Sequence, residues 1–378
     1  TAGRRATLAF AIFYMVINIG SLVGRFIAFL IRKQFDMSYI FAVGAFFSVV
    51  SFFVVLFLYR DPEADDPEAQ AARAARPKKS VGRILTDMVV VLRSPRFTFF
   101  LLASVGFFFL YSQVYNVLPL YWKRVLEADP AVDLYTAMNP FVIVFFQLLV
   151  EAVVVNLLGM LLVTRIFGKM KPIRSIIVGI VIISLSMLIN LWPIFVTEGG
   201  YRALSWNWLP FASLVACATV GLVAFGELFT SARSYEYIGA LAPKGKEGLF
   251  LGYANLPMAL GALRGGPIGA YIFNDVMCEG AVRHLDVFWW QIHSSFSVLG
   301  GALGQPMATG LMAAPMHHAG LQGPLGLLEL DAGNNAKGWI VLMAIGLGSA
   351  VLMWSYNIWL KRQLAKDAAQ AAEGSEPA

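Results

Sequence analysis

Eight long apolar blocks restrict the fold of this sequence more than any other feature. A helix needs roughly 20 residues to cross the hydrocarbon core of a bilayer, and each block provides about that length or more. Hydrocarbon offers backbone N–H and C=O groups no hydrogen-bond partner, so we expect the blocks to be helical. The sequence therefore predicts an all-α membrane protein with eight transmembrane helices at 6–31, 37–59, 98–121, 139–165, 173–195, 207–236, 247–273 and 338–360.

The charged residues are typical of a chain embedded in lipid. They make up 14% of the sequence, whereas a soluble domain carries about 25%. Twenty of the 29 Lys and Arg residues fall in segments that face the cytoplasm if the N-terminus lies there, and seven fall in outer segments. This bias predicts that both termini are cytoplasmic, in an integral protein of a bacterial inner membrane. The basic residues are scattered over several loops, so the net charge of +6 does not indicate nucleic-acid binding.

Three segments between or after the blocks are less apolar than the blocks. The stretch 60–97 begins with an Ala/Pro/charge-rich linker, and its part Val81–Leu92 has apolar residues at helical spacing, which predicts an interfacial amphipathic helix. The segment 274–337 is Gly-rich, and we expect an outer loop there with an interfacial or re-entrant element. The remaining segment, 363–378, is expected to be a cytoplasmic tail.

The sequence gives little support to metal, cofactor or enzyme chemistry. Cys217 and Cys278 are too few for a disulfide framework or a cysteine-based metal site. All four histidines lie in 274–337, and His317–His318 has no carboxylate or Cys at ligand spacing. The blocks contain no histidine, and their acids are isolated, so we expect no nucleophile–base pair. We therefore expect a protein that is not an enzyme and has no cofactor.

Small residues at every fourth position mark the block 247–273. Gly261, Gly265 and Gly269 form such a series, which favours close packing against another helix. Pro257 and Pro267 in the same block are expected to bend it.

Four charged residues lie inside the apolar blocks, namely Arg25, Glu151, Glu227 and Arg264. A charge at a helix centre costs about 2.5–3.5 kcal/mol on insertion scales, so such residues normally face a cavity or a partner. Two acids and two bases also permit structural ion pairs, and this alternative stays open. Arg25 lies nearer the outer surface, where its long side chain can reach water.

Glu227 is the strongest candidate among these charges. It precedes Glu236 by nine residues, which places it about 14 Å from the inner end of its helix at 1.5 Å per residue. Removal from water favours the neutral form of a carboxyl group, so Glu227 could bind and release a proton during transport. A structural ion pair remains the alternative.

Other polar residues extend the candidate site. Glu151 lies near the centre of its block, and Arg264 could bind a substrate carboxylate or balance Glu227. Gln113 and Asn116 are three apart and share a helix face, so they could line a cavity or join two helices. Their block also carries Tyr111 and Tyr115, and the seventh block carries Asn255.

Two further pairs mark the ends of blocks. Arg233 and Glu236 lie three apart near the inner end, where they fit a gate or an interfacial ion pair. Tyr121 and Trp122 end the third block and predict an aromatic belt at the membrane surface.

The first block resembles the signature of the proton-dependent oligopeptide transporter family, which lies on the fifth helix of a major-facilitator fold. Gly226-Glu227 with Ala242-Pro243-Lys244 resembles the family's tenth helix, and Asn139-Pro140 resembles its eighth. The resemblance runs from about 6 to 273. It departs at 231–237, where the family usually has a Ser-Pro-Gly run. The residues that carry the signature are Phe10, Phe13, Tyr14, Met15, Ile17, Asn18, Ile19, Gly20, Ser21 and Leu22.

This resemblance implies both an organisation and a function. Residues 1–59 would be the last two helices of an N-terminal bundle, 98–362 a six-helix C-terminal bundle, and four more helices would precede residue 1. The function implied is proton-coupled symport of small peptides or similar small polar solutes, with Glu227 and Asn18 among the binding residues. Partners would be the solute, protons and the lipid bilayer. Alternatives left open are a facilitator of sugars, drugs or organic anions, and a membrane protein that does not transport.

Overall fold

A computed structural model describes residues 2–36, 38–60, 89–127, 130–148, 170–195, 211–243, 246–283 and 328–373, together with residues 70, 71, 80, 82 and 86. Six helical stretches in these ranges are long and apolar enough to cross a membrane, and they confirm an α-helical membrane protein. The predicted block 139–165 is described only to residue 148, and the block 247–273 is divided into two helices. The count of eight spans therefore stays a prediction.

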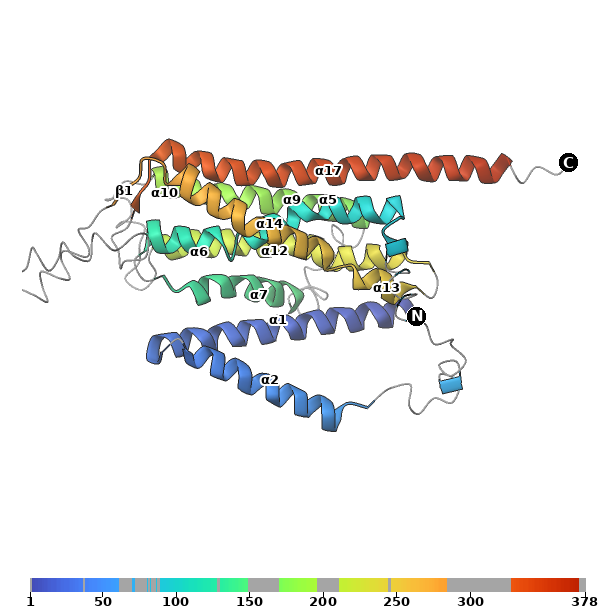
Figure 1. The fold of residues 1–378 in the computed structure, drawn as a ribbon, viewed down its shortest axis with the longest axis horizontal. Coiled ribbons are helices and arrows are strands. Elements are labelled where there is room, and N and C mark those ends of the chain that lie inside the picture. Colours follow the sequence, from blue (N-terminus) through green and yellow to red (C-terminus); the bar gives the residue numbers. More distant parts are fainter. Residues whose placement is uncertain are drawn as a thin grey trace, which may run out of the picture.

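The described helices lie side by side along one direction, with α2 inclined away from the rest and both chain ends at the same end of the bundle (Figure 1). Two short strands, β1 (Val282–Arg283) and β2 (Leu328–Glu329), pair antiparallel with Val282 opposite Glu329. The helices are α1 (Ala2–Gln34), α2 (Ser38–Leu58), α5 (Pro95–Ser112), α6 (Val117–Tyr121), α7 (Val132–Leu148), α9 (Pro172–Ser186), α10 (Trp192–Phe195), α12 (Phe211–Leu241), α13 (Glu247–Gly252), α14 (Leu256–Tyr271) and α17 (Ala332–Glu373).

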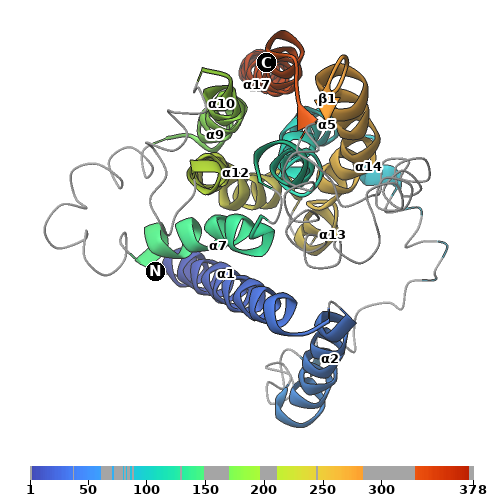
Figure 2. The ribbon, with the colours of Figure 1, turned by 90° about the vertical axis from the view of Figure 1, so that its left-hand side faces the viewer.

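Helix α12 lies between α9, α7 and α5 (Figure 2). Glycines allow the tightest of these contacts. A Cβ atom added at Gly179 of α9 would overlap the carbonyl oxygen of Gly226 on α12, and one added at Gly346 of α17 would overlap Ser184 of α9. Small residues let helix backbones approach closely in lipid, where apolar surface alone gives helices little reason to associate.

The predicted packing of the glycine series is confirmed. Helix α14 lies against α5, with Gly261 over Phe108 and Phe109 and Gly265 over Ser112. The bend expected at Pro257 is a complete break, because α13 ends at Gly252 and α14 begins at Leu256. Pro257 has no N–H to donate to the Tyr253 carbonyl oxygen four residues earlier, and in a continuous helix its ring would clash with that carbonyl.

The predicted aromatic belt at Tyr121 and Trp122 is wrong, because both side chains are fully buried inside the bundle. The Tyr121 hydroxyl accepts a hydrogen bond from Asn335 Nδ2 at 3.3 Å and donates to the Asn190 carbonyl oxygen at 3.4 Å. Its ring meets Trp339 edge to face at 4.9 Å between centroids. An aromatic residue with a polar end can be buried wherever that end finds a partner.

Helix α1 connects the N-terminal pair of helices to the rest of the bundle. It packs on α7, whereas α2 packs on α1 and has no buried residue. Near the end of α1, Arg32 forms an ion pair with Asp133 at 3.1 Å and donates a hydrogen bond to the Pro130 carbonyl oxygen at 3.2 Å.

Helix α17 is longer than the predicted block 338–360. It starts at Ala332, inside the expected outer loop, and continues through most of the expected tail to Glu373. Arg96 at the start of α5 forms an ion pair with Asp367 near the end of α17. Half of the predicted amphipathic helix Val81–Leu92 and residues 284–327 of the expected outer loop lie outside the described residues.

Candidate functional site

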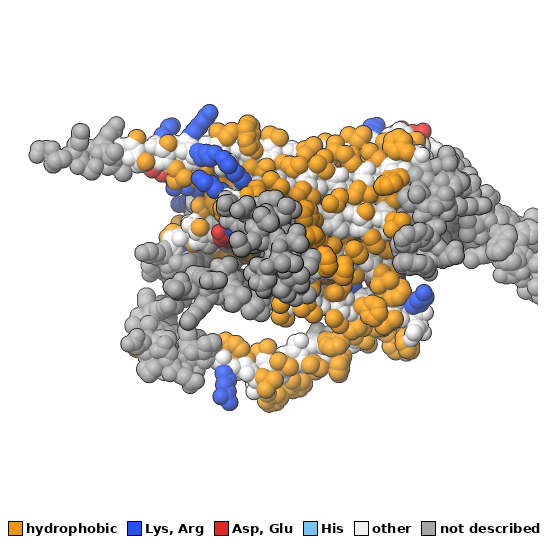
Figure 3. Space-filling view, turned by 180° about the vertical axis from the view of Figure 1, so that it is seen from behind, with side chains coloured by type: hydrophobic (Ala, Val, Ile, Leu, Met, Phe, Trp, Pro, Cys, Tyr) orange, Lys and Arg blue, Asp and Glu red, His pale blue; other side chains and the backbone are white. Residues whose placement is uncertain are grey.

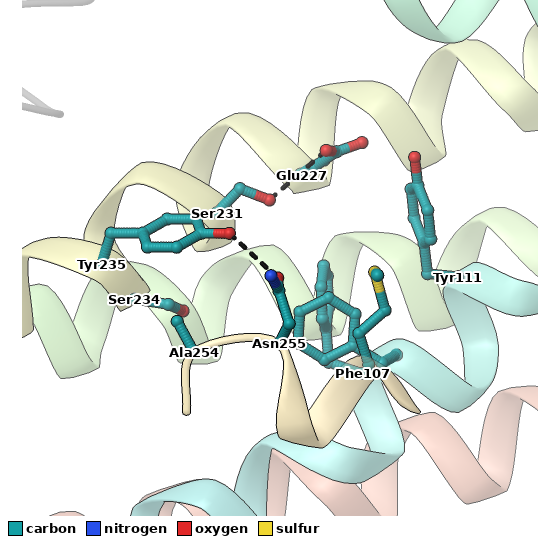
Figure 4. Close-up of a pocket in the computed structure, with 10 residues that line it drawn as sticks. Phe107, Tyr111, Glu227, Ser231, Ser234, Tyr235, Ala254 and Asn255 are labelled. Carbon is teal, nitrogen blue, oxygen red and sulfur yellow. Dashed lines mark hydrogen bonds between the residues drawn. The ribbon is translucent and has the colours of Figure 1, made fainter. Parts of the chain in front are cut away.

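A cavity of about 150 Å³ lies between α5, α12 and the junction of α13 with α14 (Figure 4). The chain is not helical at Tyr253–Asn255, between α13 and α14, and this junction leaves space beside α12. Its lining residues are Phe107, Phe108 and Tyr111 from α5, Glu227, Ser231, Ser234 and Tyr235 from α12, and Ala254, Asn255 and Met258 from the junction.

The lining residues of α12 share one helix face. Glu227, Ser231 and Tyr235 follow one another at intervals of four, which brings side chains onto the same side of a helix. Tyr235 donates a hydrogen bond from its hydroxyl to Asn255 Oδ1 at 3.2 Å. In Figure 4 this pair lies at one end of the cavity, and Glu227 and Tyr111 lie at the other.

Glu227 is buried, and both of its carboxylate oxygens accept hydrogen bonds. Asn139 of α7 donates from Nδ2 to Oε2 at 2.9 Å, and Ser231 donates from Oγ to Oε1 at 3.3 Å. Both donors are neutral, so neither cancels the negative charge. The carboxylate is therefore held at a fixed place between α7 and α12, at the edge of a cavity.

The cavity combines an acidic end with an apolar wall. Phe107, Phe108 and Met258 supply the apolar surface, while Ser231 and Asn255 supply polar groups. Such a lining can hold a small molecule that carries a cationic or hydrogen-bonding group and an apolar part.

Gln113 and Asn116 do not line this cavity. The chain from Gln113 to Asn116 is a turn that separates α5 from α6, so the two residues do not share a helix face. Gln113 is fully buried, and its Nε2 donates to the carbonyl oxygens of Phe109 at 2.8 Å and Gly265 at 3.2 Å. It joins α5 to α14.

The predicted charged residues are spread over the molecule. Arg264 is exposed on α14 and does not line the cavity. Arg25 of α1 donates a hydrogen bond to the Tyr115 hydroxyl at 3.0 Å and lies over its ring at 5.4 Å. Asn18 is buried within α1, and Glu151 lies outside the described residues.

The predicted gate residues pair with each other. Arg233 donates to Glu236 at 2.7 Å, three residues along the same helix, and the Glu236 side chain is half exposed. Neither residue lines the cavity.

Eight residues that line the cavity or bond to Glu227 carry no charge and were not assigned to the site from the sequence, namely Phe107, Phe108, Asn139, Ser231, Ser234, Tyr235, Ala254 and Met258. A search for charges inside apolar blocks cannot find them. Asn139 did carry a signal, because it precedes Pro140 in the pair that resembles the eighth family helix. Within the described ranges, no group of three His, Cys, Asp or Glu residues could hold a metal ion.

Two solved structures are similar to this chain. A bacterial homologue of the human drug peptide transporters PepT1 and PepT2 is 13% identical, with a TM-score of 0.49, over 94% of this chain and 71% of that one. PepTSo, a POT family transporter, is 16% identical, with a TM-score of 0.41, over 94% of this chain and 55% of that one. A search of curated proteins found no match.

The family profile match is the decisive finding. The profile of the Major Facilitator Superfamily matches residues 1–265, well over half of the 378 residues. Members of this superfamily are integral membrane transporters and not enzymes. This chain belongs to the Major Facilitator Superfamily.

Proposed function

We propose that the protein is a proton-coupled symporter that carries small peptides or similar small polar solutes by alternating access. The observation that supports this most directly is the Glu227 carboxylate at the edge of the cavity. The transporter signature on α1 supports the same substrate class, and so do the printed names of the two similar structures.

The hydrogen bonds of Glu227 suit a group that gains and loses a proton. An amide N–H of Asn139 can only donate, whereas the Ser231 hydroxyl can donate or accept. When a proton binds, it fits best on Oε1, where Ser231 can reverse its role and accept. Glu227 can therefore be neutralised without leaving a buried donor facing another donor.

Protonation would also change the link between α7 and α12. A hydrogen bond to an ionised carboxylate is roughly twice as strong as one between neutral groups. Neutralising Glu227 weakens its bond from Asn139, which is one of the contacts between these two helices. A ligand shifts a conformational equilibrium only through such a difference between states, and here the ligand is a proton.

We further propose that the protein lies in a bacterial inner membrane with both termini in the cytoplasm. The excess of Lys and Arg in the segments on that side supports this orientation. The position of both chain ends at one end of the bundle agrees with it (Figure 1).

A second substrate class has support from one feature of the cavity. Its apolar wall of Phe107, Phe108 and Met258 suits a drug-like cation at least as well as a polar solute. Sugars and organic anions fit less well beside a carboxylate. Membership of a transporter superfamily sets aside the alternative of a membrane protein that does not transport.

The experiment compares Glu227→Gln with the parent protein in proteoliposomes. Glutamine keeps the volume and hydrogen-bonding capacity of the side chain but cannot titrate. Peptide uptake driven by an imposed pH gradient should fall at least about tenfold, a loss equivalent to about 1.4 kcal/mol. The matched control is Glu279→Gln, which removes an exposed acid that does not line the cavity and should leave uptake unchanged.

Counterflow separates the two roles of the carboxylate, because it needs binding and reorientation but no gradient. Loss of gradient-driven uptake with counterflow retained supports proton coupling at Glu227. Loss of both supports direct binding of a substrate amine. Transport by Glu227→Gln at the level of the parent under both conditions would show that the carboxylate has only a structural role.

A further inference from the structure

Basic side chains gather at the end of the bundle where α17 leaves it (Figure 3). Two of them, Lys171 and Arg174, stand at the start of α9 and are exposed. Lys361 and Arg362 of α17 are exposed as well. The described part of α9, and α17 up to Lys366, contain no Asp or Glu. The nearest acid along α17, Asp367, is paired with Arg96.

The packing register brings the two basic pairs to nearly the same level. Helices α9 and α17 run in opposite directions, and Gly346 lies against Ser184. Because both helices rise about 1.5 Å per residue, Arg174 is then level with Tyr356. Lys171 is likewise level with Trp359, and Lys361 lies two residues beyond that level.

The same register places exposed apolar residues below the basic groups. Val178 follows Arg174 by one helical turn on the same face, and Trp354 precedes Lys361 by two turns on the same face. Helix α5 packs on both α9 and α17 and covers the inner side of the contact between these two helices. The exposed side chains beside the contact between α9 and α17 therefore lie on one outward face. The cations are at the end of the bundle, and the apolar groups are nearer its middle.

We propose that this face binds a phospholipid with an anionic headgroup. The phosphate lies between Arg174 and Lys361, with Lys171 and Arg362 beside it, and an acyl chain runs along Val178 and Trp354. The charge pattern fits this partner, because basic groups between helices near the membrane surface attract anionic headgroups, each with about 1 kcal/mol. The depth fits as well, because tryptophan favours the headgroup level and Trp359 is level with the basic residue Lys171.

Fluorescence quenching by brominated lipids tests this proposal on the full chain and requires no transport. The protein is reconstituted in mixed vesicles of phosphatidylglycerol and phosphatidylcholine, with bromine on the acyl chains of one lipid or the other. The signal of Trp354 is the difference between the parent and Trp354→Phe. We expect brominated phosphatidylglycerol to quench Trp354 several-fold more strongly than brominated phosphatidylcholine at equal mole fraction.

Charge variants identify the groups responsible. In Arg174→Gln/Lys361→Gln, this several-fold preference for phosphatidylglycerol should be lost, because the variant lacks two of the cations that attract an anionic headgroup. Lys123→Gln/Lys337→Gln removes two exposed cations at the opposite end of the bundle and should keep the preference. Arg174→Lys/Lys361→Arg conserves the charges and should keep it too.

Three outcomes would overturn the proposal. Equal quenching of Trp354 by the two lipids in the parent excludes a selective site. A preference that survives in Arg174→Gln/Lys361→Gln excludes these two residues. An equal loss in Lys123→Gln/Lys337→Gln means that net charge, and not this face, selects the lipid.

Discussion

Helices α2 and α12 are both long and apolar, yet their surroundings are opposite. The most apolar stretch of α2 has a mean hydropathy of 2.7, and none of it is buried by other parts of the protein. The stretch Ser213–Leu241 of α12 has a lower mean hydropathy of 1.7, and 61% of it is buried. The more hydrophobic helix is thus the less buried one, which reverses the rule for soluble proteins.

Small and polar residues account for this difference. The single glycine of α2, Gly44, has nothing near the position where a Cβ would be added, whereas Gly226 of α12 touches the backbone of α9. Helix α12 also carries Glu227, which bonds to α7. Lipid solvates apolar side chains as well as protein does, so hydrophobicity decides insertion, while close backbone contact and hydrogen bonds decide packing.

The largest expected effect comes from filling the contact between α9 and α12. In Gly179→Leu, the new side chain overlaps the backbone of Gly226, which cannot move aside. We expect a loss of about 3 kcal/mol in the free energy of unfolding, the upper part of the range for overpacking. Denaturant unfolding in detergent measures it. Gly44→Leu on α2 is the control and should change stability little, and equal losses in the two variants would contradict the comparison.

A second pair of variants tests the same idea within one helix. Gly265→Val on α14 places a side chain against Ser112, whereas Gly266→Val places it in open space. The Ser112 side chain can rotate away in part, so we expect Gly265→Val to destabilise the protein by about 1–2 kcal/mol. Gly266→Val should unfold at the same denaturant concentration as the parent. A larger effect for Gly266→Val would mean that α14 packs through a different face.

The ion pair Arg32–Asp133 connects α1 to α7 and should contribute less than either glycine contact. Its side chains are a third and a quarter exposed, with fractional exposures of 33% and 25%. A partly exposed pair typically contributes below about 1 kcal/mol. A double-mutant cycle with Arg32→Gln and Asp133→Asn measures the coupling, which should shrink as salt is added. A coupling that does not depend on salt would place the pair in a drier environment.

The smallest effect concerns the turn between α1 and α2. Asp36 accepts hydrogen bonds from the Ser38 hydroxyl at 2.5 Å and from its backbone N–H at 2.8 Å, and these bonds lower the Asp36 pKa below its ordinary value. The lowered pKa means that this cap is intact at neutral pH and is lost only as the pH falls through that value. In Ser38→Ala the Asp36 pKa should rise, as measured by carbon NMR of the carboxyl group. Ser48→Ala, which removes a bond within α2, should leave it unchanged.

Much of the fold could be predicted because lipid imposes a simple rule on chain composition. The predicted blocks 37–59 and 173–195 match α2 and the stretch from α9 to α10 within one or two residues. The rule fails at the end of α17, because the apolar residues end at Leu360 while the helix continues. The residues that follow are mainly Ala, Lys, Arg and Gln, which are good helix formers in water.

The candidate site was less predictable, for a physical reason. Glu227 could be found because a charge inside an apolar block is costly. Gln113 was grouped with Asn116 on the assumption of an unbroken helix, but the helix breaks between them. Tyr121 was predicted to lie at the membrane surface. It is buried instead, and its hydroxyl bonds to Asn190 and Asn335, which are far from it in the sequence. Such long-range contacts leave no trace in local spacing.

Helix α17 is much longer than a membrane crossing requires. Its 42 residues extend over about 63 Å at 1.5 Å per residue, twice the roughly 30 Å of hydrocarbon that it crosses. Beyond Leu360 the helix continues for about 20 Å, at the end of the bundle where both chain ends lie. A spectroscopic label at Gln370 therefore magnifies small motions of the bundle. A tilt of about 10° around the opposite end of α17 moves that label by about 10 Å, a change that single-molecule energy transfer can follow during transport.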